Sequence, residues 1–308
     1  MLDAPEITSL SDPAMRKRAV AELVDSGIVT FEPSAKLARS AGFRDSVVHS
    51  LLLNAWTLPS RERGNRLPAK GSTSRLVGSF SLPVTDLTRQ FCEIDLVAKQ
   101  VASCGAVLRE LKNLDRIHQL TSLRALRPFG VISISNLDGG EDTCWLITYL
   151  EKGVVPAERL AFEKYHPEQK KAFVNELAQF TARGANEWFV HGDLKLRNVG
   201  FDTTQGRVSR NNSEFLYFDL ESAIIGLSGI QKRRTRFGGI LIEAIIEKGR
   251  MANGMLADAA DLAGDLIKRL PRAYVREEFA RVYVSERSNL DGSVKKAEDY
   301  IMQRAVRT

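Results

Sequence analysis

The chain has 308 residues, 44% of them hydrophobic and 27% charged, as in an ordinary soluble globular protein with one large or two modest lobes. No apolar run reaches membrane-spanning length and the start, Met1–Glu6, lacks a signal-peptide pattern, so no membrane span and a cytoplasmic setting are expected. A net charge of +6 suits anionic ligands. The three cysteines (Cys92, Cys104, Cys144) cannot all form disulfides with one another, and their spacing is not that of metal ligands, so a reducing compartment is expected.

Residues 1 to about 60 predict an N-terminal helical extension. Ser11 and Asp12 precede a helical pattern over Pro13–Gly27, and further helices are expected over Pro33–Ser40 and Asp45–Trp56. Short, closely spaced helices with basic residues are also compatible with a helix-turn-helix. Because no base-reading side chains can be singled out, we favour a helical cap on the next lobe.

A polar stretch rich in Pro, Gly and Ser covers residues 57–74 and leads into a strand over Arg75–Leu82. Backbone amides and hydroxyls at Gly71 and Ser72 could meet phosphate oxygens there. A plain linker is an equally good interpretation of the same residues.

The next strand, Phe91–Gln100, and the helix after it carry two opposite charges. Val97 and Lys99 point to the same side of that strand. Glu110 lies on the apolar-striped helix and is the only acid between Lys99 and Asp115. Glu110 follows Lys99 by eleven residues, so the two charges can meet only if the connection from strand to helix is tight.

The rest of the chain predicts one hairpin followed by a mainly helical region. Gly130–Ser135 and Cys144–Leu150 read as the hairpin, with a turn over 136–140. One or two helices are expected over 157–187, with Pro167 in a first turn and Gly184 closing the helix. Later helices are expected over Phe237–Lys248, Leu256–Leu270, Pro271–Ser288 and Ser293–Arg304.

The most specific signal is the run from His191 through Gly192, Asp193, Lys195 and Arg197 to Asn198, which is followed by Asp219. Short apolar runs on either side predict buried strands, so Asn198 and Asp219 would stand at the two chain ends of one hairpin. A carboxylate that orients a hydroxyl, an amide and a carboxylate that hold metal, and a lysine that touches phosphate are what phosphoryl transfer needs. A polar turn between two strands is the alternative.

This run resembles the catalytic loop of the protein-kinase-like superfamily, which reads His-Arg-Asp-Leu-Lys-x-x-Asn in its commonest form. Glycine after the histidine is similar to the atypical branches: lipopolysaccharide-core kinases, small-molecule phosphotransferases, and RIO-type and Bud-type kinases. The resemblance implies an α+β, two-lobed kinase-like fold. The implied division is a helical extension over 1–60, a small β-rich N-lobe over 61–150 and a mainly helical C-lobe over 151–308.

The resemblance also implies an ATP- and Mg²⁺-dependent kinase that transfers a γ-phosphate to a hydroxyl of a protein Ser/Thr, a sugar or a small molecule. By position, Asp193 is the catalytic base and Lys195 contacts the γ-phosphate. Asn198 and Asp219 bind Mg²⁺. His191 is expected to be structural, hydrogen-bonded to backbone around the metal-binding segment.

In the small lobe, the strand ending at Lys99 resembles the Val-Ala-Ile-Lys strand of kinases. Lys99 then reaches the α- and β-phosphates, Glu110 holds it in place, and Val97 lies under the adenine. The run 146–153 resembles the last small-lobe strand and hinge. That match makes Ile147 the gatekeeper and places the backbone of Thr148, Tyr149 and Leu150 against the adenine.

Several features depart from the family pattern. No Gly-x-Gly-x-x-Gly loop is present, Leu220-Glu221 replaces the usual Phe-Gly after Asp219, and no Ala-Pro-Glu follows, so activation-loop phosphorylation is not expected. The basic run Lys232–Arg236 is a candidate contact for an anionic substrate. Two alternatives stay open: a pseudokinase that serves as a nucleotide-binding regulatory module, and a basic nucleic-acid-binding protein.

Overall fold

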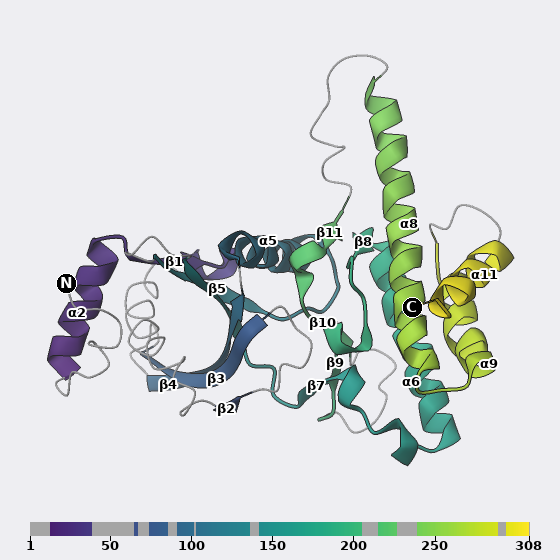
Figure 1. Ribbon diagram of the computed structural model, residues 1–308, viewed down its shortest axis with the longest axis horizontal. Helices are drawn as coiled ribbons and strands as arrows, with labels where there is room; N and C mark the ends of the chain where they lie inside the picture. Colours follow the sequence, from purple (N-terminus) through teal and green to yellow (C-terminus); the bar gives the residue numbers. More distant parts are fainter. Residues whose placement is uncertain are drawn as a thin grey trace. The chain divides into compact units, whose positions relative to one another are not determined.

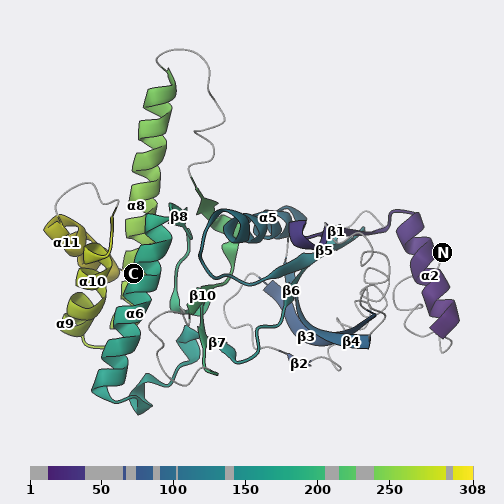
Figure 2. The ribbon, with the colours of Figure 1, turned by 180° about the vertical axis from the view of Figure 1, so that it is seen from behind.

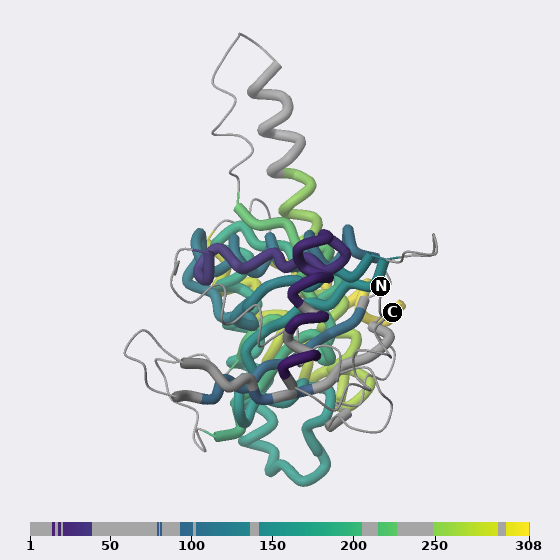
Figure 3. The backbone as a smooth tube through the Cα atoms, turned by 90° about the vertical axis from the view of Figure 1, so that its left-hand side faces the viewer, coloured from purple at the N-terminus to yellow at the C-terminus, as the bar shows by residue number. Residues whose placement is uncertain are grey.

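The computed structural model describes residues 13–38, 65–66, 74–85, 91–101, 103–135, 142–204, 215–226, 239–288 and 294–307. The chain divides into two compact units, Met1–Asp115 with Leu126–Glu151 and Arg116–Ala125 with Lys152–Thr308. Helices and strands are mixed, and the course of the backbone can be followed in Figure 1 and Figure 3.

The first unit is built on one antiparallel sheet, which in the described residues has the strand order β1-β5-β6-β4-β3-β2. Its strands are β1 (Val29–Pro33), β2 (Asn65–Arg66), β3 (Ser74–Thr85), β4 (Phe91–Val101), β5 (Pro128–Ile134) and β6 (Thr143–Tyr149). The long pair β3 and β4 curves along one side of the sheet (Figure 1). The strands predicted over Arg75–Leu82 and Phe91–Gln100 are confirmed as β3 and β4. The predicted hairpin is confirmed by the antiparallel pairing of β5 with β6.

The N-terminal residues contribute a strand as well as helices to this unit. The first predicted helix is confirmed as α2 (Pro13–Asp25), and the second is the shorter α3 (Ala35–Ala38). The third, Asp45–Trp56, lies outside the described residues. Residues 29–33, expected in a helical extension, form β1 and pair with β5. Their Val-Thr-Phe sequence suits a half-buried strand.

One hydrophobic cluster of the first unit lies on one face of the sheet. It contains Leu23, Val29, Leu37, Leu96, Ala98, Phe129, Ile132, Trp145 and Ile147. Since side chains alternate along β4, Val97 and Lys99 lie on the other face. Helix α5 (Cys104–Leu120), whose residues 104–115 belong to this unit, buries its predicted apolar stripe at Val107, Leu111, Leu114 and Ile117.

The second unit is mainly helical. Its helices are α6 (Pro167–Asn186), α8 (Gly239–Ile267), α9 (Arg272–Val275), α10 (Arg281–Ser285) and α11 (Val294–Ala305), with a π-helical stretch η6 (Arg276–Ala280) between α9 and α10. Two small antiparallel sheets join β7 (Val154–Pro156), β9 (Val199–Asp202) and β10 (Phe215–Tyr217), and β8 (Phe189–Val190) with β11 (Ile224–Ile225). Helices α6 and α8 run side by side (Figure 2).

Two glycines of this unit, Gly184 and Gly254, lie inside helices that the sequence predicted to be shorter. We expected α8 as two helices, but it continues through Gly254, where an added Cβ would lie 2.8 Å from Val190 of β8. Gly184 does not close α6, which runs on to Asn186; its missing side chain makes room for the Tyr217 hydroxyl. Both glycines serve close approach between elements rather than chain termination.

Other differences are smaller. The region before Pro167, expected to be helical, forms two short 3₁₀ turns, η2 (Ala157–Arg159) and η3 (Phe162–Lys164).

Within the described part of the chain, we find no helix with the length and apolar character needed to cross a bilayer.

Candidate active site

A buried carboxylate on α8 anchors the loop that carries Asp193. Asp258 is 5% exposed and accepts the His191 N–H at 2.6 Å and the Gly192 N–H at 3.0 Å. Burial raises the pKa of Asp258 to about 7, against the backbone N–H donors that lower it. Sequence reasoning missed this residue because its backbone partners lie 67 and 66 residues away along the chain.

His191 is fully buried and links the loop to the segment before Asp219. Its Nε2 lies 2.7 Å from the Phe218 carbonyl oxygen, and the Asp193 N–H donates to its Nδ1 at 3.4 Å. Burial lowers the pKa of His191, against the raising effect of the Phe218 carbonyl and nearby carboxylates. A neutral ring protonated on Nε2 satisfies both contacts. The predicted structural role of His191 is therefore confirmed.

The Asp193 carboxylate lies between two cations. Lys195 Nζ donates to its Oδ1, while Arg197 Nη2 at 3.1 Å and Asn198 Nδ2 at 3.3 Å donate to its Oδ2. Burial raises the pKa of Asp193, but the hydrogen bonds and charges of Lys195 and Arg197 outweigh burial and lower the pKa overall. The carboxylate is therefore ionised at neutral pH and suited to orienting a hydroxyl.

Asn198 and Asp219 come from the same end of the β9–β10 pair. The register pairs Val199 with Tyr217, and the Phe218 N–H donates to the Asn198 carbonyl oxygen at 2.9 Å. The Asn198 side-chain Nδ2 donates to the Asp193 carbonyl oxygen at 2.8 Å. The Oδ1 of the same planar amide therefore points away from that carbonyl.

These two side chains offer an amide oxygen and a carboxylate, the hard ligands that Mg²⁺ takes. Among the described residues no group of three or more His, Cys, Asp or Glu could hold a metal ion. Mg²⁺ commonly binds one or two protein carboxylates together with substrate phosphates, so the donor set fits this ion.

The backbone around the loop explains the glycine after His191. Gly192 has φ +86°, and an added Cβ would lie 2.9 Å from the Ser222 carbonyl oxygen. Ser222 ends the 3₁₀ turn η5 (Leu220–Ser222), which follows Asp219, itself at φ +55°. The loop thus packs directly on the turn after Asp219, and only glycine fits at position 192.

In the first unit, the expected ion pair is present. Lys99 Nζ lies 2.9 Å and 3.2 Å from the two carboxylate oxygens of Glu110, whose residue is 2% exposed. Asp115, the other acid near the end of the helix, accepts the Ala35 N–H at 2.9 Å and so supports α3. The short β4–α5 connection is compatible with the pair.

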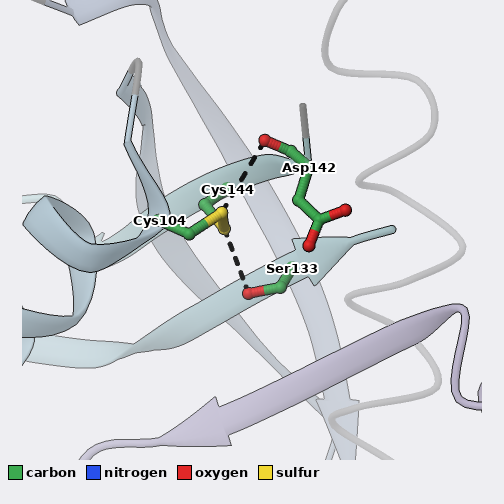
Figure 4. Close-up of a disulfide and its surroundings, with 4 residues drawn as sticks. All are labelled: Cys104, Ser133, Asp142 and Cys144. Atoms are coloured by element: carbon green, nitrogen blue, oxygen red, sulfur yellow. Dashed lines mark hydrogen bonds between the residues drawn. A yellow bond between two sulfur atoms is a disulfide. The ribbon is translucent and has the colours of Figure 1, made fainter. Parts of the chain in front are cut away.

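A disulfide between Cys104 and Cys144 ties the first residue of α5 to β6 (Figure 4). The Ser133 hydroxyl of β5 lies 3.2 Å from the Cys144 sulfur. Cys144 is opposite Val101, two residues beyond Lys99 on β4. The helix that carries Glu110 is therefore fixed covalently to the sheet that carries Lys99, a pairing that the sequence analysis did not foresee.

The predicted adenine contacts require a correction. Ile147 lies in the sheet core with Ala98, on the face opposite Lys99, whereas Thr148 pairs with Val97 across the strands. Thr148, not Ile147, therefore lies on the Lys99 face of the sheet.

The N–H groups of the next two residues are used within the first unit. Tyr149 donates to the Arg127 carbonyl and Leu150 to the Asp95 carbonyl, each at 2.9 Å. The candidate phosphate loop at Gly71 and Ser72 and the basic run Lys232–Arg236 lie outside the described residues.

No protein-family model and no curated protein matches the sequence. Among solved structures the chain is similar to WaaP in complex with acyl carrier protein, with a TM-score of 0.50, 13% identity and coverage of 91% of this chain and 98% of that chain. A mutant of the PAN3 pseudokinase from Neurospora crassa aligns at a TM-score of 0.34 and 10% identity, over 81% and 64% of the two chains. The chain therefore has a mixed α+β fold of the protein-kinase-like kind, similar to the fold of WaaP.

Proposed function

We propose that this protein is an ATP- and Mg²⁺-dependent phosphotransferase that moves the γ-phosphate of ATP to a hydroxyl group. The observation that carries the proposal is the arrangement of one loop in the second unit. Asp193 lies between Lys195 and Arg197 and beside Asn198, whose carbonyl accepts the N–H of the residue before Asp219. The likeness of the fold to WaaP supports it.

In this proposal each loop residue has one task. Asp193 orients the acceptor hydroxyl and takes its proton as the hydroxyl oxygen bonds to the γ-phosphorus and the bond to the bridging oxygen of ADP breaks. Lys195, which contacts Asp193, reaches the γ-phosphate. Asn198 and Asp219 hold Mg²⁺, which when bound neutralises phosphate charge.

The first unit would contribute a lysine that binds nucleotide phosphates. Lys99, held by the nearly buried Glu110, neutralises the α- and β-phosphates, and Val97 packs on the adenine. Because Tyr149 and Leu150 already donate within the sheet, hydrogen-bond donors to adenine come from residues after Leu150. Gly192 and Leu220-Glu221 favour a sugar or small-molecule acceptor, whereas Lys195 favours protein Ser/Thr.

Two observations favour the second candidate, a pseudokinase that binds nucleotide without turnover. The two backbone donors expected at the hinge are occupied, and the Asp193 carboxylate is covered by two cations. Labelled ATP separates the candidates, because only the phosphotransferase produces ADP together with a labelled acceptor.

The test uses Asp193→Ala and Asp219→Ala, with Asp299→Ala as the control because Asp299 pairs with Arg276 on the surface of the same unit. Purified proteins are incubated with labelled ATP, Mg²⁺ and panels of protein, sugar and small-molecule acceptors. We expect both site variants to lose transfer while keeping the wild-type circular dichroism. Transfer at the wild-type rate in either site variant rules out the assignment.

Calorimetry provides a second readout of the metal site. Asp219→Ala should weaken ATP binding in the presence of Mg²⁺ and leave metal-free ATP binding unchanged. An equal loss with and without the metal would show that Asp219 does not serve as a ligand.

A further inference from the structure

The short turn that carries Asn198 has an unusual support. The 3₁₀ turn η4 (Leu196–Asn198) has Lys195 at its N-cap, and no side chain of the cap residue bonds to the turn. Its first N–H, that of Leu196, donates instead to Asp265 Oδ2 at 3.1 Å. Asp265 belongs to α8 and is far away in the sequence, so a distant helix supplies the acceptor that a local cap ordinarily provides.

Asp265 follows Asp258 by about two helical turns, so both carboxylates lie on one face of α8. Asp258 receives the N–H groups of His191 and Gly192 at the start of the loop. Asp265 receives the N–H of Leu196 near its end. Helix α8 therefore holds the loop at two points, with Asp193 between them.

The contact between Asp265 and the Leu196 N–H supports Asn198, the candidate metal ligand. Asn198 follows Leu196 within the same turn, and its Nδ2 is directed at the Asp193 carbonyl. Fixing the Leu196 N–H fixes the rotation of η4 and with it the direction of the Asn198 amide oxygen. Asp265 is kept in place by Lys268, whose Nζ lies 3.3 Å from Oδ1.

We infer that Asp265 is a positioning residue for Asn198 and so sets the affinity of the site for Mg²⁺. This inference rests on the proposed function, because it takes Asn198 to be a ligand. Asp265 contacts neither the metal nor the substrate; it acts through the backbone of Leu196. Partners that orient a metal ligand commonly change metal affinity by about 10- to 100-fold when removed.

The test compares four variants in Mg²⁺ titrations of ATP binding. Asp265→Ala and Asp265→Leu remove the acceptor, and the leucine preserves bulk in case the alanine variant folds poorly. Asp265→Asn keeps an oxygen at the same position and should rescue binding. Asp261→Ala is the control, since Asp261 lies on the same helix and pairs with Arg304.

We expect Asp265→Ala and Asp265→Leu to need roughly tenfold more Mg²⁺ for half-maximal ATP binding, with metal-free ATP affinity unchanged. Asp265→Asn and Asp261→Ala should stay near the wild type. An unchanged Mg²⁺ requirement in Asp265→Ala and Asp265→Leu overturns the inference. So does an equal loss of metal-free and metal-dependent binding, which indicates a general structural role.

Amide hydrogen exchange distinguishes failure of this inference from failure of the proposed function. The Leu196 amide should exchange faster in Asp265→Ala than in the wild type, whatever the protein binds. If the wild type shows no Mg²⁺-dependent ATP binding, the proposed function fails, and the inference fails with it even where exchange changes. If the wild type binds Mg²⁺-ATP but Leu196 exchange is the same in both proteins, only the positioning role is rejected.

Discussion

Asp193 shares its two carboxylate oxygens among two cations and an amide, so its environment differs from that of a lone general base. The positive charges stabilise the ionised form and lower the pKa despite partial burial. A carboxylate of this kind orients a hydroxyl well and takes its proton only late in the reaction, as a loose phosphoryl-transfer transition state requires.

The first prediction follows from this charge balance. Arg197→Ala removes one cation from Asp193, so the pKa of Asp193 should rise and the acid limb of the kcat/KM profile should move to higher pH. The measurement is phosphate transfer across the acidic range, with Arg276→Ala as control because Arg276 pairs with Glu298 and Asp299 elsewhere in the second unit. An acid limb at the wild-type pH in Arg197→Ala would contradict the arrangement.

At the scale of elements, helix α5 combines the side chain that pairs with Lys99 and a covalent tie to the sheet. Glu110 holds Lys99 from within the helix, while Cys104 at its first residue is bonded to Cys144 on β6. The bond spans a sequence separation of 40 residues. Closing a loop of this length contributes about 4 kcal/mol in the chain-entropy model.

We therefore predict that the double variant Cys104→Ser, Cys144→Ser destabilises the first unit and loosens the start of α5. Its thermal transition should fall by several degrees, and amide exchange at residues 104–110 should rise. Cys92→Ser is the matched control, since Cys92 takes no part in the bond. Equal exchange in the double variant and the wild type would show that packing alone fixes the helix.

The elements that could be predicted from the sequence are those with local patterns. Strand β4 and helix α5 have clear periodicity, and the spacing from His191 to Asn198 indicated the loop without further context. The elements that were missed depend on distant partners. Strand β1 exists because it pairs with β5, nearly one hundred residues later.

The anchors of the loop were missed for the same reason. Asp258 and Asp265 accept backbone N–H groups separated from them by 67 and 69 residues, and no local pattern marks an acceptor for a distant backbone. Residues 249–255 were left between two expected helices, although α8 continues through them and Gly254 lets it approach Val190. Such close contacts are properties of packing, which a linear pattern of residue types does not contain.

At the scale of the whole molecule, two compact units carry different parts of the proposed chemistry. The first unit supplies Lys99 and Glu110, and the second supplies Asp193, Asn198 and Asp219. Chains with more than one unit often unfold in separate transitions, so each unit can be followed by itself. Loss of the disulfide should lower the stability seen in the unfolding transition of the first unit. The pH should change the stability seen in the transition of the second unit.

Asp258 gives the pH prediction its sign. Its pKa is about 7 in the folded protein against 3.8 as the ordinary value, so the folded state keeps a proton that the unfolded state releases between these pH values. The contribution of Asp258 to the stability of the second unit should be greatest below about pH 4 and should fall as the pH rises to about 7, by an amount on the order of 4 kcal/mol at roughly 1.4 kcal/mol per pH unit.

Urea unfolding between pH 5 and 8 measures this contribution as the difference between the wild type and Asp258→Asn, which cannot ionise. His191, whose pKa burial lowers, acts in the opposite direction but is present in both proteins and cancels. The wild type should lose stability relative to Asp258→Asn as the pH rises. A constant difference across the range would mean that Asp258 is already ionised in the folded state at pH 5, as it is in the unfolded state, and that its pKa is not raised.

The contact between Gly192 and the Ser222 carbonyl also restricts how this loop can be redesigned. A designer who introduces the more familiar arginine at position 192 would force a side chain against the backbone of η5. Such a graft would succeed only if residues 220–222 were rebuilt in the same step, so the two segments have to be exchanged together as one cassette.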